Sequence, residues 1–160
     1  MLISTRGRYA LRVMVDLAQH DTGEYIPLKE IAERQGISKE YLNSILKTLV
    51  ENDLLLSLRG KGGGYKLTHE PAYYSVGMVL RLVEGDLAPV SCVSGADPCP
   101  REVGCPSLKM WRKLDFLIND FFDSITITDL MEPDDASFFD NEEIERRIAE
   151  ELGEEKPKKK

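Results

Sequence analysis

The sequence predicts a mainly α-helical fold with one small two-stranded β-hairpin. Residues 4–20, 28–35 and 38–51 have apolar residues at spacings of three and four, which is typical of amphipathic helices. The short apolar run Leu54 to Leu58 is followed by four glycines within five residues, which favour a tight turn between two strands. A long apolar stripe returns over residues 107–125 and predicts a long helix.

The helix expected over residues 38–51 has one apolar and one polar face. Ser38 can cap it, because a serine hydroxyl accepts hydrogen bonds from the free amides of a first helical turn. Its apolar stripe consists of Leu42, Ile45, Leu46 and Leu49. Its opposite face carries Lys39, Glu40, Asn43, Lys47 and Thr48. A helix, a short turn containing Gly36 and a second helix with a polar outer face are typical of a helix-turn-helix.

The glycine-rich hairpin adds positive charge next to this helix. Arg59 and Lys61 lie at its tip, and the second strand is expected over Tyr65 to Thr68. A polar helix followed by a cationic hairpin is the layout of a winged helix-turn-helix. In that fold the helix enters the major groove of DNA, and the hairpin, or wing, contacts the backbone or the minor groove. Double-stranded DNA is therefore the predicted partner.

Three other interpretations are weaker. A helical-hairpin protein with a flexible glycine-rich loop is one. A phosphate-binding loop is another, but the glycines lack the GxxxxGK[ST] order and a helix precedes the first strand. An enzyme is disfavoured because the only histidines, His20 and His69, lie at the ends of expected elements, and no nucleophile–base pair can be identified.

Composition divides the 160 residues into four parts. The DNA-binding domain is expected over residues 1–85, with a helix at Val76 to Gly85, and has eleven Lys/Arg against ten Asp/Glu, a net charge of +1. The rest of the chain has ten against eighteen, a net charge of −8. A cysteine-bearing segment follows at 86–106, a dimerisation helix at 107–131 and an acidic flexible tail at 132–160. The acidic charge thus lies outside the domain where a polyanion would bind.

The long helix has more apolar surface than a small domain can cover. Its stripe consists of Leu108, Trp111, Leu114, Leu117, Ile118, Phe121 and Ile125, widened by Met110, Phe116 and Phe122. Pairing with the same helix of a second copy would bury this surface. We therefore expect a homodimer, whose two-fold symmetry presents two helix-turn-helix units to two half-sites.

All three cysteines lie in one segment that contains four prolines and two glycines, which predict a loop. Cys92, Cys99 and Cys105 have the spacing Cys-x6-Cys-x5-Cys, and thiolates on such a loop can converge on one soft metal centre. Zinc is disfavoured because no CxxC pair is present. An iron–sulfur cluster, three unrelated thiols and a metal-free thiol redox sensor remain as alternatives.

The same cysteines indicate a cytoplasmic protein. Their odd number argues against a disulfide framework and for a reducing compartment. No run of about eighteen apolar residues could span a membrane. Asp16 interrupts the apolar N-terminal stretch and no small-residue cleavage site follows, so this stretch is expected to belong to the fold.

Much of the chain resembles the bacterial winged-helix regulators typified by IscR, with NsrR and CymR as relatives. The resemblance covers residue 1 to about 131 and is carried by the cysteine segment and by the stretches ISTRGRYALRVMVDLA, ISKEYLNSILKTL, LRGKGGGYKL and WRKLDFLINDFFDSITITDL. It implies a homodimeric transcription factor, which we expect to be a repressor. In the IscR and NsrR branches it also implies an iron–sulfur cluster, [2Fe-2S] or alternatively [4Fe-4S], that reports iron–sulfur or redox status.

The resemblance also assigns roles to individual residues. The residues expected to bind DNA are Ser38, Lys39, Tyr41 and Asn43 of the recognition helix and Arg59, Gly60 and Lys61 of the wing. Those expected to hold the cluster are Cys92, Cys99 and Cys105. CymR-type members lack these cysteines and need no cluster, so the three cysteines favour the cluster-bearing branches. The alternative function is a cluster-free regulator, like CymR, controlled by a partner protein or by thiol oxidation.

The chain departs from the family pattern around the cluster. Six residues separate its first two cysteines, whereas IscR has five. Leu108 stands where the IscR branch has a histidine, and Arg8 where NsrR-type proteins can use an acidic ligand. The fourth ligand is therefore open among Asp97, Glu102, Ser107 and a solvent or small-molecule ligand. Asn43 also replaces an acidic residue of the IscR recognition helix.

Overall fold

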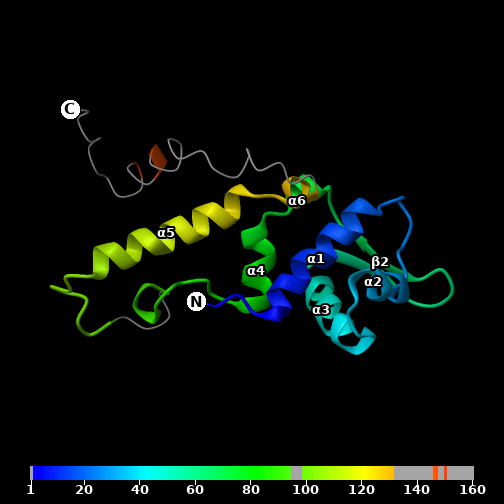
Figure 1. Ribbon diagram of the computed structural model, residues 1–160, viewed down its shortest axis with the longest axis horizontal. Helices are drawn as coiled ribbons and strands as arrows, with labels where there is room; N and C mark the ends of the chain where they lie inside the picture. Colours follow the sequence, from blue (N-terminus) through cyan, green and yellow to red (C-terminus); the bar gives the residue numbers. More distant parts are fainter. Residues whose placement is uncertain (1, 95–98, 132–145, 148–149, 151–160) are drawn as a thin grey trace. The chain divides into compact units, whose positions relative to one another are not determined.

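The computed structural model describes residues 2–94, 99–131, 146, 147 and 150 (Figure 1). They fall into two compact units. The N-terminal unit consists of Leu2–Gly85 with Phe122–Pro133, and the cysteine unit is centred on Asp86–Phe121. The predicted fold class, mainly α-helical with a two-stranded wing, is confirmed. None of the described helices combines the length and the hydropathy that a membrane span requires.

The elements follow the expected order along the chain. The N-terminal unit contains α1 (Thr5–Gln19), α2 (Leu28–Gln35), α3 (Lys39–Glu51), β1 (Leu55–Leu58), β2 (Gly64–Leu67), the 3-10 helix η1 (Pro71–Tyr73), α4 (Val76–Glu84) and α6 (Ile127–Met131). The two strands pair antiparallel, from Leu55 opposite Leu67 to Leu58 opposite Gly64. The remaining elements are the 3-10 helix η2 (Ser91–Val93) and α5 (Leu108–Ser124).

The core of the N-terminal unit is built from the stripes that the periodicity predicted. The stripe of α3 is wholly inaccessible to solvent and consists of Leu42, Ile45, Leu46 and Leu49. The stripe of α1 packs with it and consists of Ala10, Val13, Met14 and Leu17. Burying these side chains contributes about 1.5–3 kcal/mol for each large aliphatic residue, so the position of α3 is set mainly by its apolar face.

Tyr74 ties the base of the wing to the segment that precedes α4. Its side chain is fully buried, and its hydroxyl donates to the carbonyl oxygen of Leu54 at 3.1 Å and accepts from the amide of His69 at 2.7 Å. The hydroxyl of Thr68 lies 2.8 Å away. A buried hydroxyl without such partners would be costly, so this cluster of hydrogen bonds specifies how the chain leaves the wing.

Glu84 connects the end of α4 to the start of α1. Its Oε1 accepts from the amide and hydroxyl of Ser4, at 3.2 and 2.6 Å, and from the amide of Gly7 at 2.9 Å. A carboxylate at a helix N-terminus satisfies free amides and is favoured by the helix dipole. A Cβ at position 7 would lie 2.3 Å from this oxygen, so glycine leaves room for the Glu84 carboxylate in its present position.

The long helix predicted over residues 107–125 is present as α5, and the rest of segment 107–131 forms a separate short helix, α6. The chain is extended at Ile125 and Thr126, where Ile125 accepts from the amide of Val76 at 2.8 Å. Thr126 then caps α6 through reciprocal hydrogen bonds with Asp129, at 2.8 and 3.3 Å. This threonine–aspartate capping box starts a new helix. Ile127 is fully buried and α6 packs against α1 and η1, so this part of the segment completes the core of the N-terminal unit.

A buried ionic network joins α1 to α2. Asp16 is 2% exposed and accepts from Arg34 at 2.7 and 2.9 Å and from Gln35 at 2.8 Å. Burial by itself would raise the pKa of the Asp16 carboxyl. The hydrogen bonds from Arg34 and Gln35 outweigh burial and hold this pKa below its usual value.

We expect Asp16→Asn to lower the free energy of unfolding by about 2 kcal/mol at neutral pH, because Arg34 loses its buried ionic partner and keeps only the longer, more exposed pair with Glu30. A carboxyl whose pKa is lowered by folding stabilises the protein fully above about pH 4, and this stabilisation is lost as the pH falls through the lowered pKa. The difference between wild type and variant in urea titrations should therefore shrink below about pH 4. Asp21→Asn, in an exposed turn, is the control. A difference that stayed constant with pH would contradict this role for Asp16.

Candidate nucleic-acid interface and cysteine segment

The helix that the sequence predicts to be the recognition helix is α3, and capping residues define the end of α2 and the start of α3. Gly36 ends α2 with φ of 65°, a left-handed conformation that suits glycine. The hydroxyl of Ser38 accepts from the amide of Tyr41 at 3.3 Å and caps the start of α3, as predicted. Because the apolar stripe of α3 faces the core, the opposite face is exposed to solvent.

The four predicted DNA-binding residues of α3 are exposed and lie within its first two turns: Ser38, Lys39, Tyr41 and Asn43. The ring of Tyr41 is in edge-to-face contact with that of Tyr9 on α1, with 5.9 Å between centroids. Arg6 of α1 donates to the hydroxyl of Thr48 at 2.7 Å. These contacts link α1 to the exposed face of α3 and orient part of it.

The wing is tightly anchored at its base. Tyr65 of β2 exchanges two hydrogen bonds of 2.9 Å with Ile26, which lies just before α2, so Ile26 forms an isolated antiparallel β-bridge with the wing. A Cβ on Gly64 would lie 2.1 Å from the carbonyl oxygen of Ile26. Glycine is therefore required at that position for backbone approach. At the tip, Gly60 has φ of 95°.

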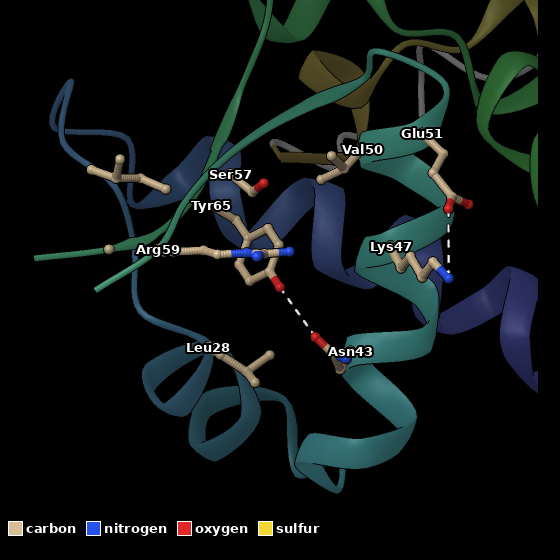
Figure 2. Close-up of a pocket in the computed structure, with 11 residues that line it drawn as sticks. Leu28, Asn43, Lys47, Val50, Glu51, Ser57, Arg59 and Tyr65 are labelled. Carbon is tan, nitrogen blue, oxygen red and sulfur yellow. Dashed lines mark hydrogen bonds and ion pairs between the residues drawn. The ribbon is translucent and has the colours of Figure 1, made fainter. Parts of the chain in front are cut away.

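A groove of about 470 Å³ separates α3 from the wing (Figure 2). From α3 it is lined by Asn43, Lys47, Val50 and Glu51, and from the wing by Ser57, Leu58, Arg59, Gly63, Gly64 and Tyr65. The hydroxyl of Tyr65 donates to Oδ1 of Asn43 at 3.2 Å across this groove. The structure thus brings two of the predicted residues, Asn43 and Arg59, to the same groove.

Two cations, Lys47 and Arg59, and one carboxylate, Glu51, line the groove, and further cations lie elsewhere on α3 and the wing. Lys39, Arg59 and Lys61 have no acidic partner among the residues that the structure describes. Lys47 is paired with Glu51 at 3.6 Å, but both side chains are mostly exposed, so the pair is weak. Gly60 and Lys61 lie at the wing tip and do not line the groove. Cations on a recognition helix and a wing suit contacts to phosphates on either side of a DNA groove.

The cysteines lie in the other unit and are free, partly exposed thiols. Cys92 falls within η2, and Cys105 lies just before α5 with its Sγ 3.5 Å from the hydroxyl of Ser107. Hydrogen bonds from the hydroxyl and the amide of Ser107 hold the pKa of the Cys105 thiol below its usual value. Within the described ranges, no three metal-binding side chains come together.

The candidates for a fourth ligand have different surroundings. Glu102 forms an ion pair with Arg112 of α5. Ser107 remains next to Cys105. Asp97 lies outside the described residues. The fourth ligand therefore stays an open prediction.

Sequence patterns missed the side chains that connect the elements. Tyr65 was expected only as the start of a strand, and its hydrogen bond to Asn43 depends on a contact between residues 22 positions apart. Arg6 and Thr48 meet over 42 positions. Neither contact can be predicted from neighbouring residues in the sequence. The only hint was Tyr65, an aromatic residue beside a glycine-rich turn, whose ring could be expected to pack near the recognition helix.

Comparison with known proteins agrees with this architecture. Residues 3–133 match the family model described as "Rrf2: Iron-dependent Transcriptional regulator". The regulator IscR of Aliivibrio salmonicida is 37% identical over 131 residues, covering 82% of this chain and 77% of that protein. IscR of Vibrio parahaemolyticus is 34% identical over 153 residues, covering 96% and 86%.

Solved structures of two regulators are also similar. CymR, the global cysteine regulator of B. subtilis, superimposes with a TM-score of 0.68 at 32% identity, covering 84% of this chain and 99% of that one. T. potens IscR superimposes with a TM-score of 0.65 at 33% identity, covering 89% and 96%. These relatives are regulators and not enzymes, which confirms the prediction that this chain is not an enzyme. With its helix-turn-helix, its wing and these relatives, the chain belongs to the Rrf2 family and is a DNA-binding transcriptional regulator of the IscR type.

Proposed function

We propose that this protein is a homodimeric repressor that binds operator DNA through α3 and the wing and responds to iron–sulfur or redox status through Cys92, Cys99 and Cys105. The observation that carries the DNA-binding part is the groove between α3 and the wing. Exposed polar side chains border it on one side and Arg59 on the other. In this arrangement Ser38, Lys39, Tyr41 and Asn43 contact base edges or nearby phosphates, and Arg59 enters the minor groove.

The proposal of a homodimer is supported by α5. None of its apolar side chains is fully buried, and its one buried residue is Asp120. Met110 is 54% and Leu114 38% exposed, one turn apart on the helix. An amphipathic helix whose apolar face lacks a full cover gains stability by pairing with its own copy. Two-fold pairing would supply the two DNA-binding units that a two-part operator requires.

The proposal of a cluster is supported by the donor set. Three free, partly exposed thiols lie on one short segment, and thiolates are the ligands that iron–sulfur clusters prefer. Cys92, Cys99 and Cys105 would hold the cluster, [2Fe-2S] or alternatively [4Fe-4S], with a fourth ligand still to be identified. When bound, such a cluster supplies a redox-active group whose integrity depends on oxidants and iron supply. The cysteine segment leads directly into α5, so gain or loss of the cluster would change the segment that precedes the proposed dimer helix.

A cluster-free regulator is the second candidate. The similarity to CymR favours it, since a structure named for cysteine regulation covers 84% of this chain. In this case the thiols act by oxidation, or a partner protein binds the regulator. The iron and sulfide content of the purified protein distinguishes the cluster-bearing regulator from the cluster-free one.

Arg59→Ala should weaken binding to operator DNA about tenfold and should reduce the slope of log affinity against log salt by about two, because each protomer of the dimer loses one cation from the minor groove beside the phosphates. Fluorescence anisotropy with a labelled operator at several salt concentrations measures both. Lys109→Ala removes the same charge from α5 and is the matched control. Equal affinities for wild type and Arg59→Ala at matched salt would remove the wing from the mechanism.

The double substitution Met110→Gln and Leu114→Gln should convert the dimer into a monomer at micromolar concentration, because it places polar groups in the apolar interface. Sedimentation equilibrium measures the mass directly. The control is Lys109→Gln with Lys113→Gln, which alters exposed polar positions of the same helix. A wild-type protein that sediments as a monomer would contradict the proposed dimer.

Protein purified without oxygen should contain about two iron and two sulfide per monomer and absorb visible light, or about four of each for the larger cluster. Cys99→Ala should lose the iron and the absorbance, because one thiolate ligand is removed. Ser91→Ala, in the same segment, should keep both. Wild-type protein without iron under these conditions would support the cluster-free alternative.

A further inference from the structure

The hydrogen bond between Tyr65 and Asn43 links the wing to the recognition helix. Tyr65 lies on β2 and Asn43 on the exposed face of α3, and the hydroxyl donates to Oδ1 over 3.2 Å (Figure 2). Both residues line the groove next to Arg59. A contact at this place affects a side chain that is part of the proposed DNA-binding surface.

Tyr65 is well suited to hold another side chain in place. Its backbone is paired on both sides, with Ser57 of β1 and with Ile26 through two hydrogen bonds of 2.9 Å. Its side chain is partly buried, so the ring loses little freedom when it binds Asn43. The hydroxyl therefore reaches the groove from a fixed strand.

This contact changes what Asn43 offers to DNA. A free carboxamide has one acceptor oxygen and two N–H donors. Oδ1 already accepts from Tyr65, whereas Nδ2 has no hydrogen-bond partner among the described residues. The amide is therefore held with its oxygen toward the wing, and its N–H groups are the polar atoms available for a base.

We infer that Tyr65 is a specificity-determining residue, which makes Asn43 a donor toward the acceptor edge of guanine and disfavours adenine. An unconstrained asparagine typically binds adenine with both of its groups, the oxygen accepting from N6 and the nitrogen donating to N7. With the oxygen turned toward Tyr65 on the wing and the amide nitrogen on the opposite side, the adenine N6 amino group lacks an acceptor at its own position. Guanine presents two acceptors, N7 and O6, to the same N–H groups. This inference rests on the proposed contact of α3 with base edges.

Selection from a library of randomised double-stranded DNA tests the inference with the full-length protein. Wild type, Asn43→Ala and Tyr65→Phe are compared, and sequencing gives the preference at each base pair. Asn43→Ala should remove the preference at one base pair of each half-site, and wild type should prefer guanine there. Tyr65→Phe keeps the ring but removes the hydroxyl. It should lower the guanine-to-adenine ratio at that base pair roughly five- to tenfold.

Tyr73→Phe is the matched control, because this tyrosine is 56% exposed and does not line the groove. It should leave all preferences unchanged. The inference is wrong if wild type prefers adenine at the Asn43-dependent base pair, if Tyr65→Phe has the wild-type ratio, or if Asn43→Ala changes no preference. In these cases the proposed function stands. Wild type that enriches no sequence would overturn the DNA-binding proposal itself and this inference with it.

Asn43→Asp gives a second test that leaves Tyr65 intact and serves if Tyr65→Phe does not fold. A carboxylate can still accept from the Tyr65 hydroxyl, but it has no donor for a base and instead accepts from the N4 amino group of cytosine. The preferred base at the Asn43-dependent position should therefore change from guanine to cytosine. An unchanged preference for guanine would overturn the inference.

Discussion

The exposed face of α3 depends on the complete burial of its opposite face. Four aliphatic side chains of this helix are inaccessible to solvent, and they pack against the buried stripe of α1. Any rotation of α3 about its axis would bring an aliphatic side chain into water, at a cost of about 1.5–3 kcal/mol for each residue. The direction in which Asn43 and Tyr41 point is therefore a consequence of core packing. A substitution that loosens the core of the N-terminal unit would also disturb the surface proposed to bind DNA.

Much of this unit could be predicted because its signals are local. Ser38 and Gly36 delimit helices through hydrogen bonds and dihedral angles that involve only a few neighbouring residues. The stripe of α3 follows from the helical period alone. The glycine run indicated a tight turn, although the requirement for Gly64 comes from Ile26, which is far away in the sequence.

The contacts that orient side chains could not be predicted in the same way. Tyr65 meets Asn43, and Arg6 meets Thr48, only after the helices and strands have packed. The division of segment 107–131 did have a local signal, since Thr126 and Asp129 have the spacing of a capping box. This signal was overlooked because the apolar stripe predicted for the long helix runs up to the residue just before Thr126. For the cysteines, spacing identifies donors but does not place them in space, so their role requires measurement of metal content.

The double hydrogen bond between Ile26 and Tyr65 has a consequence for the shape of the operator. It fixes the strand of the wing to the residue that leads into α2, so the wing and the helix-turn-helix form one body. In the proposed complex, the distance between α3 in one DNA groove and the wing at the next would then be a property of the protein. The DNA would have to adjust its groove widths to this distance, and base steps that deform easily would be favoured at positions that no side chain touches. Part of the sequence preference would thus arise from the stiffness of the duplex.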